Sequence, residues 1–308
     1  MRKINSFIWF LGLFSGLLLS ACGGNDVAEV PIVIPTEEDE ECCSLAEEAN
    51  TKQLLSNYQE VANLSGQTVG KYTIKVYARK ADLSVGYNDL WFAVEKTENG
   101  RHVKDVAFSD LSPLMDMGTM RHSTPVANVF MQVDDLPVYH TWVSLLMVGE
   151  WSLSFSYRIK ESSGTLSDGK PTVQALPEGQ IWLKSFKVSD DTYYLSLANP
   201  QAFQTGINTI TAYISKRGAD AALPYLPATE TFTVDIYPTM PDMGNHTSPN
   251  NEALTRQADG SYQGQLNLTM TGTWDIHLTV RDADGNIVGG TESTGSEVLS
   301  ELLWTITI

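Results

Sequence analysis

Apolar and polar residues alternate along most of the chain beyond residue 70, as expected for strands that bury one face. The clearest alternating segments are 72–77, 90–94, 151–157 and 274–280. Asn-Gly and Asp-Gly dipeptides, which favour tight turns between strands, occur at 99–100, 168–169, 259–260 and 284–285. Neither half beyond residue 70 has a long amphipathic helical pattern. The sequence therefore predicts an all-β fold.

The same residues recur in the same order in two halves of the chain. The first copy contains Asp110-Leu111-x-Pro113, Asp116-Met117-Gly118, His122-Ser123-Thr124-Pro125, Tyr139 and Met147-x-Gly149-x-Trp151. The second copy contains Asp235-Ile236-x-Pro238, Asp242-Met243-Gly244, His246-Thr247-Ser248-Pro249, Tyr262 and Met270-x-Gly272-x-Trp274. A repeat of roughly 120 residues has the size of one domain. We therefore predict tandem immunoglobulin-like antiparallel β-sandwiches at 67–178 and 179–308.

The amino-terminal residues have the pattern of an export signal. Arg2 and Lys3 precede an apolar segment at 7–19, which is too short to span a membrane. Leu19-Ser20-Ala21-Cys22 resembles the bacterial lipobox, which implies a signal peptide at 1–21 and a lipidated, palmitate-carrying Cys22. The alternative is an ordinary secretory signal with an incidental cysteine. We expect a lipid-anchored, extracytoplasmic protein of the cell envelope, at the outer membrane in preference to the inner.

Residues 22–66 are acidic and poor in aromatic residues, which favours a flexible tether, although 45–64 has the spacing of a short helix. Cys42 and Cys43 lie here, outside both repeats, so no disulfide framework holds the repeats together. We expect two exposed thiols, with a soft-metal site or an intermolecular bridge as alternatives. Removing 1–21 takes the net charge from −17 to −19, because Arg2 and Lys3 are lost. Such acidity repels phosphate backbones and excludes nucleic acid as a partner.

Methionine and histidine gather in one loop of each copy. The first copy supplies Met115, Met117, Met120 and His122, and the second supplies Met240, Met243 and His246. Neutral, soft thioethers favour Cu(I), and imidazole also binds copper. Copper is therefore the expected metal, and packing of the methionines inside the protein is the alternative. By strand parity, Met147 and Met270 are expected in the core, and His277 is expected to face outward.

Both copies resemble the YtkA-like domain family, which is similar in pattern to FixH-type and other small copper-associated sandwiches, and the second copy is the closer match. The resemblance rests on Met240-Pro241-Asp242-Met243-Gly244, Gly260-x-Tyr262 and Gly272-x-Trp274. It implies an extracytoplasmic β-sandwich and is compatible with copper binding. The first copy departs from the pattern, with Leu114-Met115 in place of Met-Pro. In the second copy Asn245 separates Met-Gly from His246, where the family pattern has histidine directly after Met-Gly.

Enzyme motifs are missing from the sequence: it has no Gly-x-Ser-x-Gly, no His-Glu-x-x-His and no phosphate-binding loop. We therefore expect a non-enzymatic lipoprotein that binds a soft metal ion, copper, through its Met/His loops. The alternative is an interaction or structural module of the cell envelope that binds no metal and has an envelope protein as its partner. In that case Tyr87, Trp91, Tyr139 and Trp142 form the core and a partner face.

Overall fold

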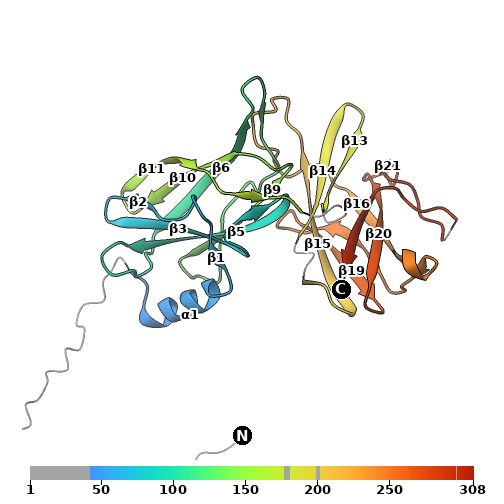
Figure 1. Cartoon of the computed structure of the whole chain (residues 1–308), viewed down its shortest axis with the longest axis horizontal. Coiled ribbons are helices and arrows are strands. Elements are labelled where there is room, and N and C mark those ends of the chain that lie inside the picture. Colours follow the sequence, from blue (N-terminus) through green and yellow to red (C-terminus); the bar gives the residue numbers. More distant parts are fainter. Residues whose placement is uncertain (1–41, 177–180, 199–201, 296) are drawn as a thin grey trace, which may run out of the picture. The chain divides into compact units, whose positions relative to one another are not determined.

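The computed structural model describes residues 42–176, 181–198, 202–295 and 297–308. Almost all regular structure in these ranges is antiparallel β-sheet, with a single α-helix, α1 (Leu45–Leu55) (Figure 1). The predicted all-β fold is therefore confirmed. No helix among these residues is long and apolar enough to cross a membrane. The signal segment, the acidic run at 37–41 and Cys22 lie outside the described residues.

The first copy of the repeat forms two main sheets around one core. One sheet has the strand order β1 (Gln59–Glu60), β3 (Tyr72–Ala78), β5 (Gly86–Lys96), β9 (Val138–Leu145) and β8 (Met131–Gln132), with β2 (Gln67–Val69) beside β3. The other has the order β11 (Ser162–Gly169), β10 (Trp151–Ile159), β6 (Val106–Asp116) and β7 (Arg121–His122). A parallel pair, β4 (Leu83–Ser84) and β12 (Val173–Gln174), completes this part. Its core contains buried side chains from residues 61–173.

The second copy forms one ten-stranded sheet around a separate core of residues 182–306. Its main path is β13 (Leu183–Val188), β14 (Asp191–Leu197), β15 (Gly206–Lys216), β19 (Tyr262–Leu268), β18 (Glu252–Arg256), β16 (Thr233–Met240), β20 (Thr273–Arg281) and β21 (Ile287–Gly289). β17 (His246–Thr247) pairs with β16, and β22 (Leu303–Thr307) pairs with β20. The end strands β13 and β21 lie against each other, so the sheet curls into a near-barrel.

The recurring Gly-x-Asn motif has the same role in both copies. The Asn88 side chain donates to the carbonyls of Ser84 and Gly86, at 2.8 Å each, and accepts from the Ser84 amide at 2.9 Å. Asn208 makes the same three contacts, with residues 204 and 206. The asparagine therefore closes the turn that opens strand β5 or β15, and this local task explains why the motif recurs.

The recurring Met-x-Gly-x-Trp motif places one tryptophan at the centre of each core. Trp151 and Trp274 are buried, and each indole N–H donates to a carbonyl four residues earlier, of Met147 at 2.9 Å and Met270 at 3.0 Å. The predicted core position is correct for Met270, which packs against the second core. It is wrong for Met147, whose side chain is 39% exposed. At Met147 the motif depends on the main-chain carbonyl, which accepts the Trp151 hydrogen bond, and not on the side chain.

Residues 42–66 differ from the expected tether, because they fold against the first copy. Ser44 and Glu47 form a capping box at the start of α1, and the helix lies where the sequence has helical spacing. Leu55 packs with Ala93 and Val138 on the outer face of β5 and β9, and Leu64 belongs to the first core. The apolar side chains of this segment therefore bind it to the sheet. The proposed domain limits remain a prediction.

Three of the four turn dipeptides are in turns. Gly100, Gly260 and Gly285 have φ values of 67°, 84° and 83°, in the left-handed region that glycine tolerates. Gly169 instead ends strand β11, where it pairs with Leu153. The predicted turn at 168–169 is therefore wrong, because the partner strand β10 continues the ladder to this point.

Candidate metal centre

The Met/His segment of the first copy is a hairpin made by β6 and β7. Met115 lies opposite His122 in the ladder, and Asp116 lies opposite Arg121. Directly opposite residues share a face of the sheet, with Cβ atoms about 5 Å apart. The hairpin therefore brings a thioether and an imidazole side by side.

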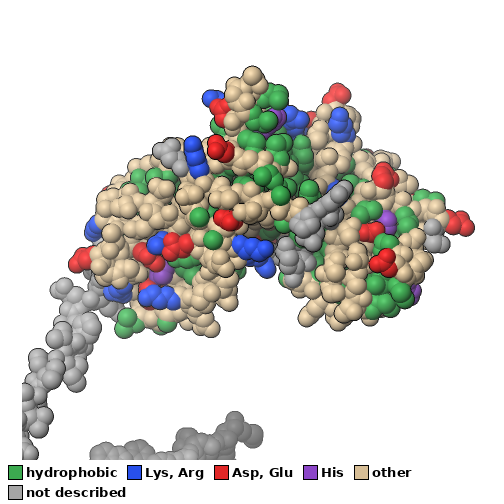
Figure 2. Space-filling view, viewed as in Figure 1, with side chains coloured by type: hydrophobic (Ala, Val, Ile, Leu, Met, Phe, Trp, Pro, Cys, Tyr) green, Lys and Arg blue, Asp and Glu red, His purple; other side chains and the backbone are tan. Residues whose placement is uncertain are grey.

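The turn of this hairpin is held by Asp116 and presents two methionines to solvent. The Asp116 carboxylate accepts from the Gly118 amide at 2.8 Å and from Arg121 Nε at 3.0 Å. These contacts hold the pKa of Asp116 below its ordinary value. Met117 and Met120 are 52% and 55% exposed. Figure 2 shows hydrophobic and histidine side chains at the surface of the segment that projects at the top of the view.

The second copy builds the same arrangement with a shorter turn. Met240 lies opposite His246 in the β16–β17 ladder, and the 3₁₀ turn η2 (Pro241–Met243) joins the two strands. Gly244 ends the turn with φ 65°, and the Asn245 amide donates to the Met240 carbonyl at 3.0 Å. Met243 is 58% exposed, and His246 is also exposed. Asn245, which separates Met-Gly from histidine in the sequence, completes the turn and leaves His246 opposite Met240.

The first methionine of each hairpin is buried against a recurring glycine. Met115 and Met240 are each 4% exposed and belong to the two cores. A Cβ added at Gly149 would lie 2.6 Å from Met115 Cε, and one at Gly272 would lie 2.7 Å from Met240 Cε. Both distances are shorter than any van der Waals contact between carbon atoms. Methionine and glycine therefore recur together because the missing Cβ makes room for the thioether.

The donors at these hairpins are sulfur and nitrogen atoms. Among the described residues, no group of three or more His, Cys, Asp or Glu side chains is placed to hold a metal ion. A metal at either hairpin would therefore depend on thioethers together with one imidazole. That donor set suits Cu(I) and is poor for Zn(II), Mg(II) or Ca(II).

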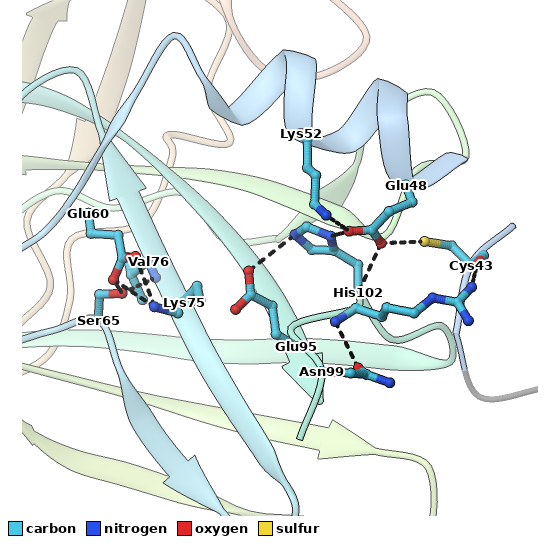
Figure 3. Close-up of polar contacts among 11 residues, drawn as sticks. Cys43, Glu48, Lys52, Glu60, Ser65, Lys75, Val76, Glu95, Asn99 and His102 are labelled. Carbon is cyan, nitrogen blue, oxygen red and sulfur yellow. Dashed lines mark hydrogen bonds and ion pairs between the residues drawn. The ribbon is translucent and has the colours of Figure 1, made fainter. Parts of the chain in front are cut away.

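Cys42 and Cys43 are buried, so the expected exposed thiols are a wrong prediction. Cys43 Sγ donates to Glu48 Oε2 at 3.2 Å, and Glu48 Oε1 lies 3.0 Å from His102 Nδ1 (Figure 3). Burial and the carboxylate raise the pKa of Cys43 to about 12, which keeps the thiol protonated. Burial opposes ionisation of Glu48, but hydrogen bonds from Lys52, the His102 amide and Cys43 lower its pKa to about 2. This cluster fastens α1 to the sheet.

His277 is 5% exposed, so the outward orientation expected from strand parity is wrong. Its Nδ1 lies 2.7 Å from the Ser300 carbonyl, and its Nε2 lies 3.1 Å from Thr239 Oγ1. The segment before β22 covers this face of β20, so both faces of the strand are buried. His277 is a hydrogen-bonded interior residue.

A second polar cluster on the first copy was not identified from the sequence. Asp89 is 6% exposed, and its Oδ1 accepts from Tyr87 at 2.6 Å and lies 3.0 Å from His140 Nε2. Arg79 Nε lies 3.7 Å from Asp89 Oδ2. Burial opposes ionisation of Asp89, but the contacts with His140, Tyr87 and Arg79 hold its pKa below the ordinary value. The sequence holds one sign of this cluster when the two copies are aligned. The second copy has Ile207 and Thr209 where the first has Tyr87 and Asp89.

The comparison with solved structures returned a bacterial adhesin, an invasin, an S-layer protein and a T cell receptor among its matches, each at a TM-score of 0.25 or below. The Escherichia coli adhesin FdeC is 10% identical, with a TM-score of 0.23, and the match covers 78% of this chain and 65% of that one. Invasin, a bacterial integrin-binding protein, is 11% identical, with a TM-score of 0.22 and coverage of 79% and 41%. Domains 5–6 of the S-layer protein SbsC are 9% identical, with a TM-score of 0.25 and coverage of 73% and 91%. At these TM-scores the likeness carries no inference about function.

The comparison with curated protein sequences gave no match. The model of the YtkA-like family matches residues 187–279, from β13 to β20, and this range includes Met240, Met243 and His246. The match confirms the family resemblance predicted for the second copy and does not extend to the first copy. The second copy of the repeat is therefore similar to the YtkA-like family over residues 187–279.

Proposed function

We propose that this chain is a lipid-anchored extracytoplasmic protein of the bacterial cell envelope that binds Cu(I) at its two Met/His hairpins. One observation carries the proposal: both copies pair a methionine with a histidine across a short antiparallel ladder, next to exposed methionines in the turn. An exposed methionine in a turn contributes little to folding. Exposed methionines occur in the turns of both hairpins, and a role as metal ligands explains this better than packing does.

The donors differ between the two hairpins. The first offers Met117, Met120 and His122 toward solvent, and the second offers Met243 and His246. Met115 and Met240 lie opposite the histidines but are buried in the two cores, so either would supply a further thioether only after its side chain left the core. Three soft or borderline donors suffice for a d¹⁰ ion such as Cu(I), which does not require a fourth ligand. The role in the cell is to bind or transfer copper, without catalysis.

The anchoring part of the proposal rests on the amino-terminal sequence. Cys22 follows Leu19-Ser20-Ala21 after a short apolar segment. Cys22→Ser should move the protein from the membrane fraction to the soluble fraction, because a protein with no acyl chain loses its hydrophobic attachment. Unchanged partitioning of the variant would contradict lipidation.

Copper binding is tested by titrating the metal-free, full-length chain with Cu(I) against a chromogenic Cu(I) chelator. The wild type should take up to two Cu(I) per chain. Met117→Leu with Met120→Leu should remove one, and Met243→Leu should remove the other. Each Met→Leu exchange conserves side-chain volume and should cost less than about 1.5 kcal/mol of stability.

The matched control is Met131→Leu. Met131 is 40% exposed in β8 and lies opposite His140 in the β8–β9 ladder, so it repeats the Met/His pairing outside both hairpins, without the turn methionines. This variant should bind as much Cu(I) as the wild type. A wild-type chain that leaves all copper with the chelator would refute the proposal, and so would equal losses from Met131→Leu and Met243→Leu.

An apolar pocket supports the alternative function, an envelope interaction module without metal. The pocket has a volume of about 460 Å³ and is lined by Leu111, Phe130, Leu223 and Leu226 among others. Leu223 and Leu226 are 58% and 52% exposed, although apolar side chains of this size are usually buried. This function becomes the better explanation if the titration finds no copper.

A further inference from the structure

A mixed polar and aromatic groove, away from the Met/His hairpins, is lined by β5 and β9 of the first copy and by β15 and residues 202–204 of the second. Its volume is about 520 Å³, within the range of small-ligand sites, and its lining includes Tyr58, Tyr87, Asp89, Trp91, His140 and Tyr213. An adjoining cavity of about 240 Å³ shares Arg79, Tyr87 and Asp89 with it. The two cavities thus form one groove with the buried Asp89 carboxylate where they meet.

Aromatic rings form the walls of the groove. Trp91 lies 4.8 Å from Tyr58 and 4.6 Å from His140, measured between ring centroids. Tyr213 stacks on Tyr87 at 5.6 Å with an interplanar angle of 4°. Partly exposed rings of this kind offer flat apolar faces on which a ligand can stack.

The polar groups of the groove carry nearly balanced charge. Asp89 Oδ2 lies 3.7 Å from Arg79 Nε, and Arg79 is half exposed at the groove. Gln204, Thr209 and Thr211 add uncharged donors and acceptors. The Asp89 carboxylate disfavours an anion, and the Arg79 guanidinium disfavours a cation. The groove therefore suits a neutral ligand with many hydroxyl groups.

The second copy shows that the fold does not require these side chains. Trp91 lies opposite His140 in the β5–β9 ladder, and the equivalent pair in the β15–β19 ladder is Thr211 opposite Gln263. Tyr87 and Asp89 similarly correspond to residues 207 and 209, an isoleucine and a threonine. The second copy builds the same ladder without any aromatic or charged residue at these positions. The first copy therefore carries these aromatic and charged side chains for a reason other than forming the ladder.

We propose that this groove binds a neutral saccharide. The C–H faces of a pyranose ring are apolar and pack on aromatic side chains, whereas its hydroxyls form hydrogen bonds with carboxylate, guanidinium and amide groups. The groove presents both kinds of surface: Trp91 and Tyr58 form the stacking platform, and Asp89 and Arg79 take the hydroxyls. The site is independent of copper binding.

The test is calorimetric titration of the metal-free, full-length chain in a detergent without a sugar headgroup. The probes are cellotetraose, the tetramer of N-acetylglucosamine and mannotetraose, with choline as a cationic probe and tetragalacturonate as an anionic one. At least one neutral tetrasaccharide should bind. Trp91→Thr and His140→Gln, which install the residues of the second copy, should each weaken it about ten-fold or more.

Asp89→Asn keeps the shape of the carboxyl group and should also weaken saccharide binding. Tyr157→Thr is the control, because it removes an aromatic ring from β10, outside the groove. Thermal unfolding verifies that each variant is folded. If Trp91→Thr does not fold, saccharide binding by Asp89→Asn and by His140→Gln tests the proposal. The proposal is overturned if the wild type binds none of the three neutral probes, if choline or tetragalacturonate binds more tightly, or if the groove variants bind as the wild type does.

Discussion

Replacing Gly272 with alanine should destabilise the protein mainly through a collision with Met240. The new Cβ would lie 2.7 Å from Met240 Cε, and Gly272 has a φ of 134°, which residues with a Cβ rarely adopt. Overpacking of a core costs about 1–3 kcal/mol, and backbone strain of this kind also costs about 1–3 kcal/mol. The free energy of unfolding should therefore fall by about 2–6 kcal/mol.

A double-mutant cycle separates the collision from the strain. Met240→Ala alone should cost about 2–5 kcal/mol, because it leaves a cavity next to Gly272 in the second core. Adding Gly272→Ala to that variant should cost only the strain, because the thioether methyl is gone. The coupling free energy between the two positions should then be about 1–3 kcal/mol.

The measurement is urea unfolding followed by tryptophan fluorescence and far-ultraviolet circular dichroism. Gly244→Ala serves as the control, because Gly244 has a φ of 65° and no atom within 4 Å of an added Cβ. Gly244→Ala should lower the free energy of unfolding through backbone strain alone, by the same amount with and without Met240. If Gly272→Ala costs the same with and without Met240, the explanation of the recurring Met and Gly as a packed pair is wrong.

Three further predictions concern the segment before residue 67. The fragment 42–178 should unfold at a higher urea concentration than 67–178, which lacks the core residue Leu64; equal midpoints would contradict this. Glu48 has a folded pKa of about 2, below its ordinary 4.5, so the stability it contributes is full above about pH 4.5 and is lost toward pH 2. The hydrogen-exchange protection factors of the α1 amides should fall over that range, and less so in Glu48→Gln. Native Cys43 should react with iodoacetamide at pH 8 far more slowly than the urea-unfolded chain, and fast native labelling would exclude its buried, protonated state.

The fold class and the recurring local motifs could be predicted from the amino-acid sequence alone. A period of two is an intrinsic property of a strand with one buried face, so alternation predicts strands without knowledge of their partners. The Asn88 and Asn208 turns and the Trp151 and Trp274 hydrogen bonds join residues within four positions of each other. Contacts this local depend on few other residues, and for that reason they were visible as a repeat. The Met/His hairpins were recognised as candidate sites for the same reason.

Which of these residues are buried, and what they contact, depends on how the whole chain packs. His277 is interior because residues distant in the chain cover the second face of its strand, and alternation assumes that this face is open to solvent. Cys43 is buried because α1 packs against the sheet, and its partner Glu48 joins it to His102, 54 positions further along. Asp89 and His140 meet across the β5–β9 sheet, 51 residues apart. Strand pairing and coverage of a face depend on the whole chain, so such contacts leave no local pattern in the sequence.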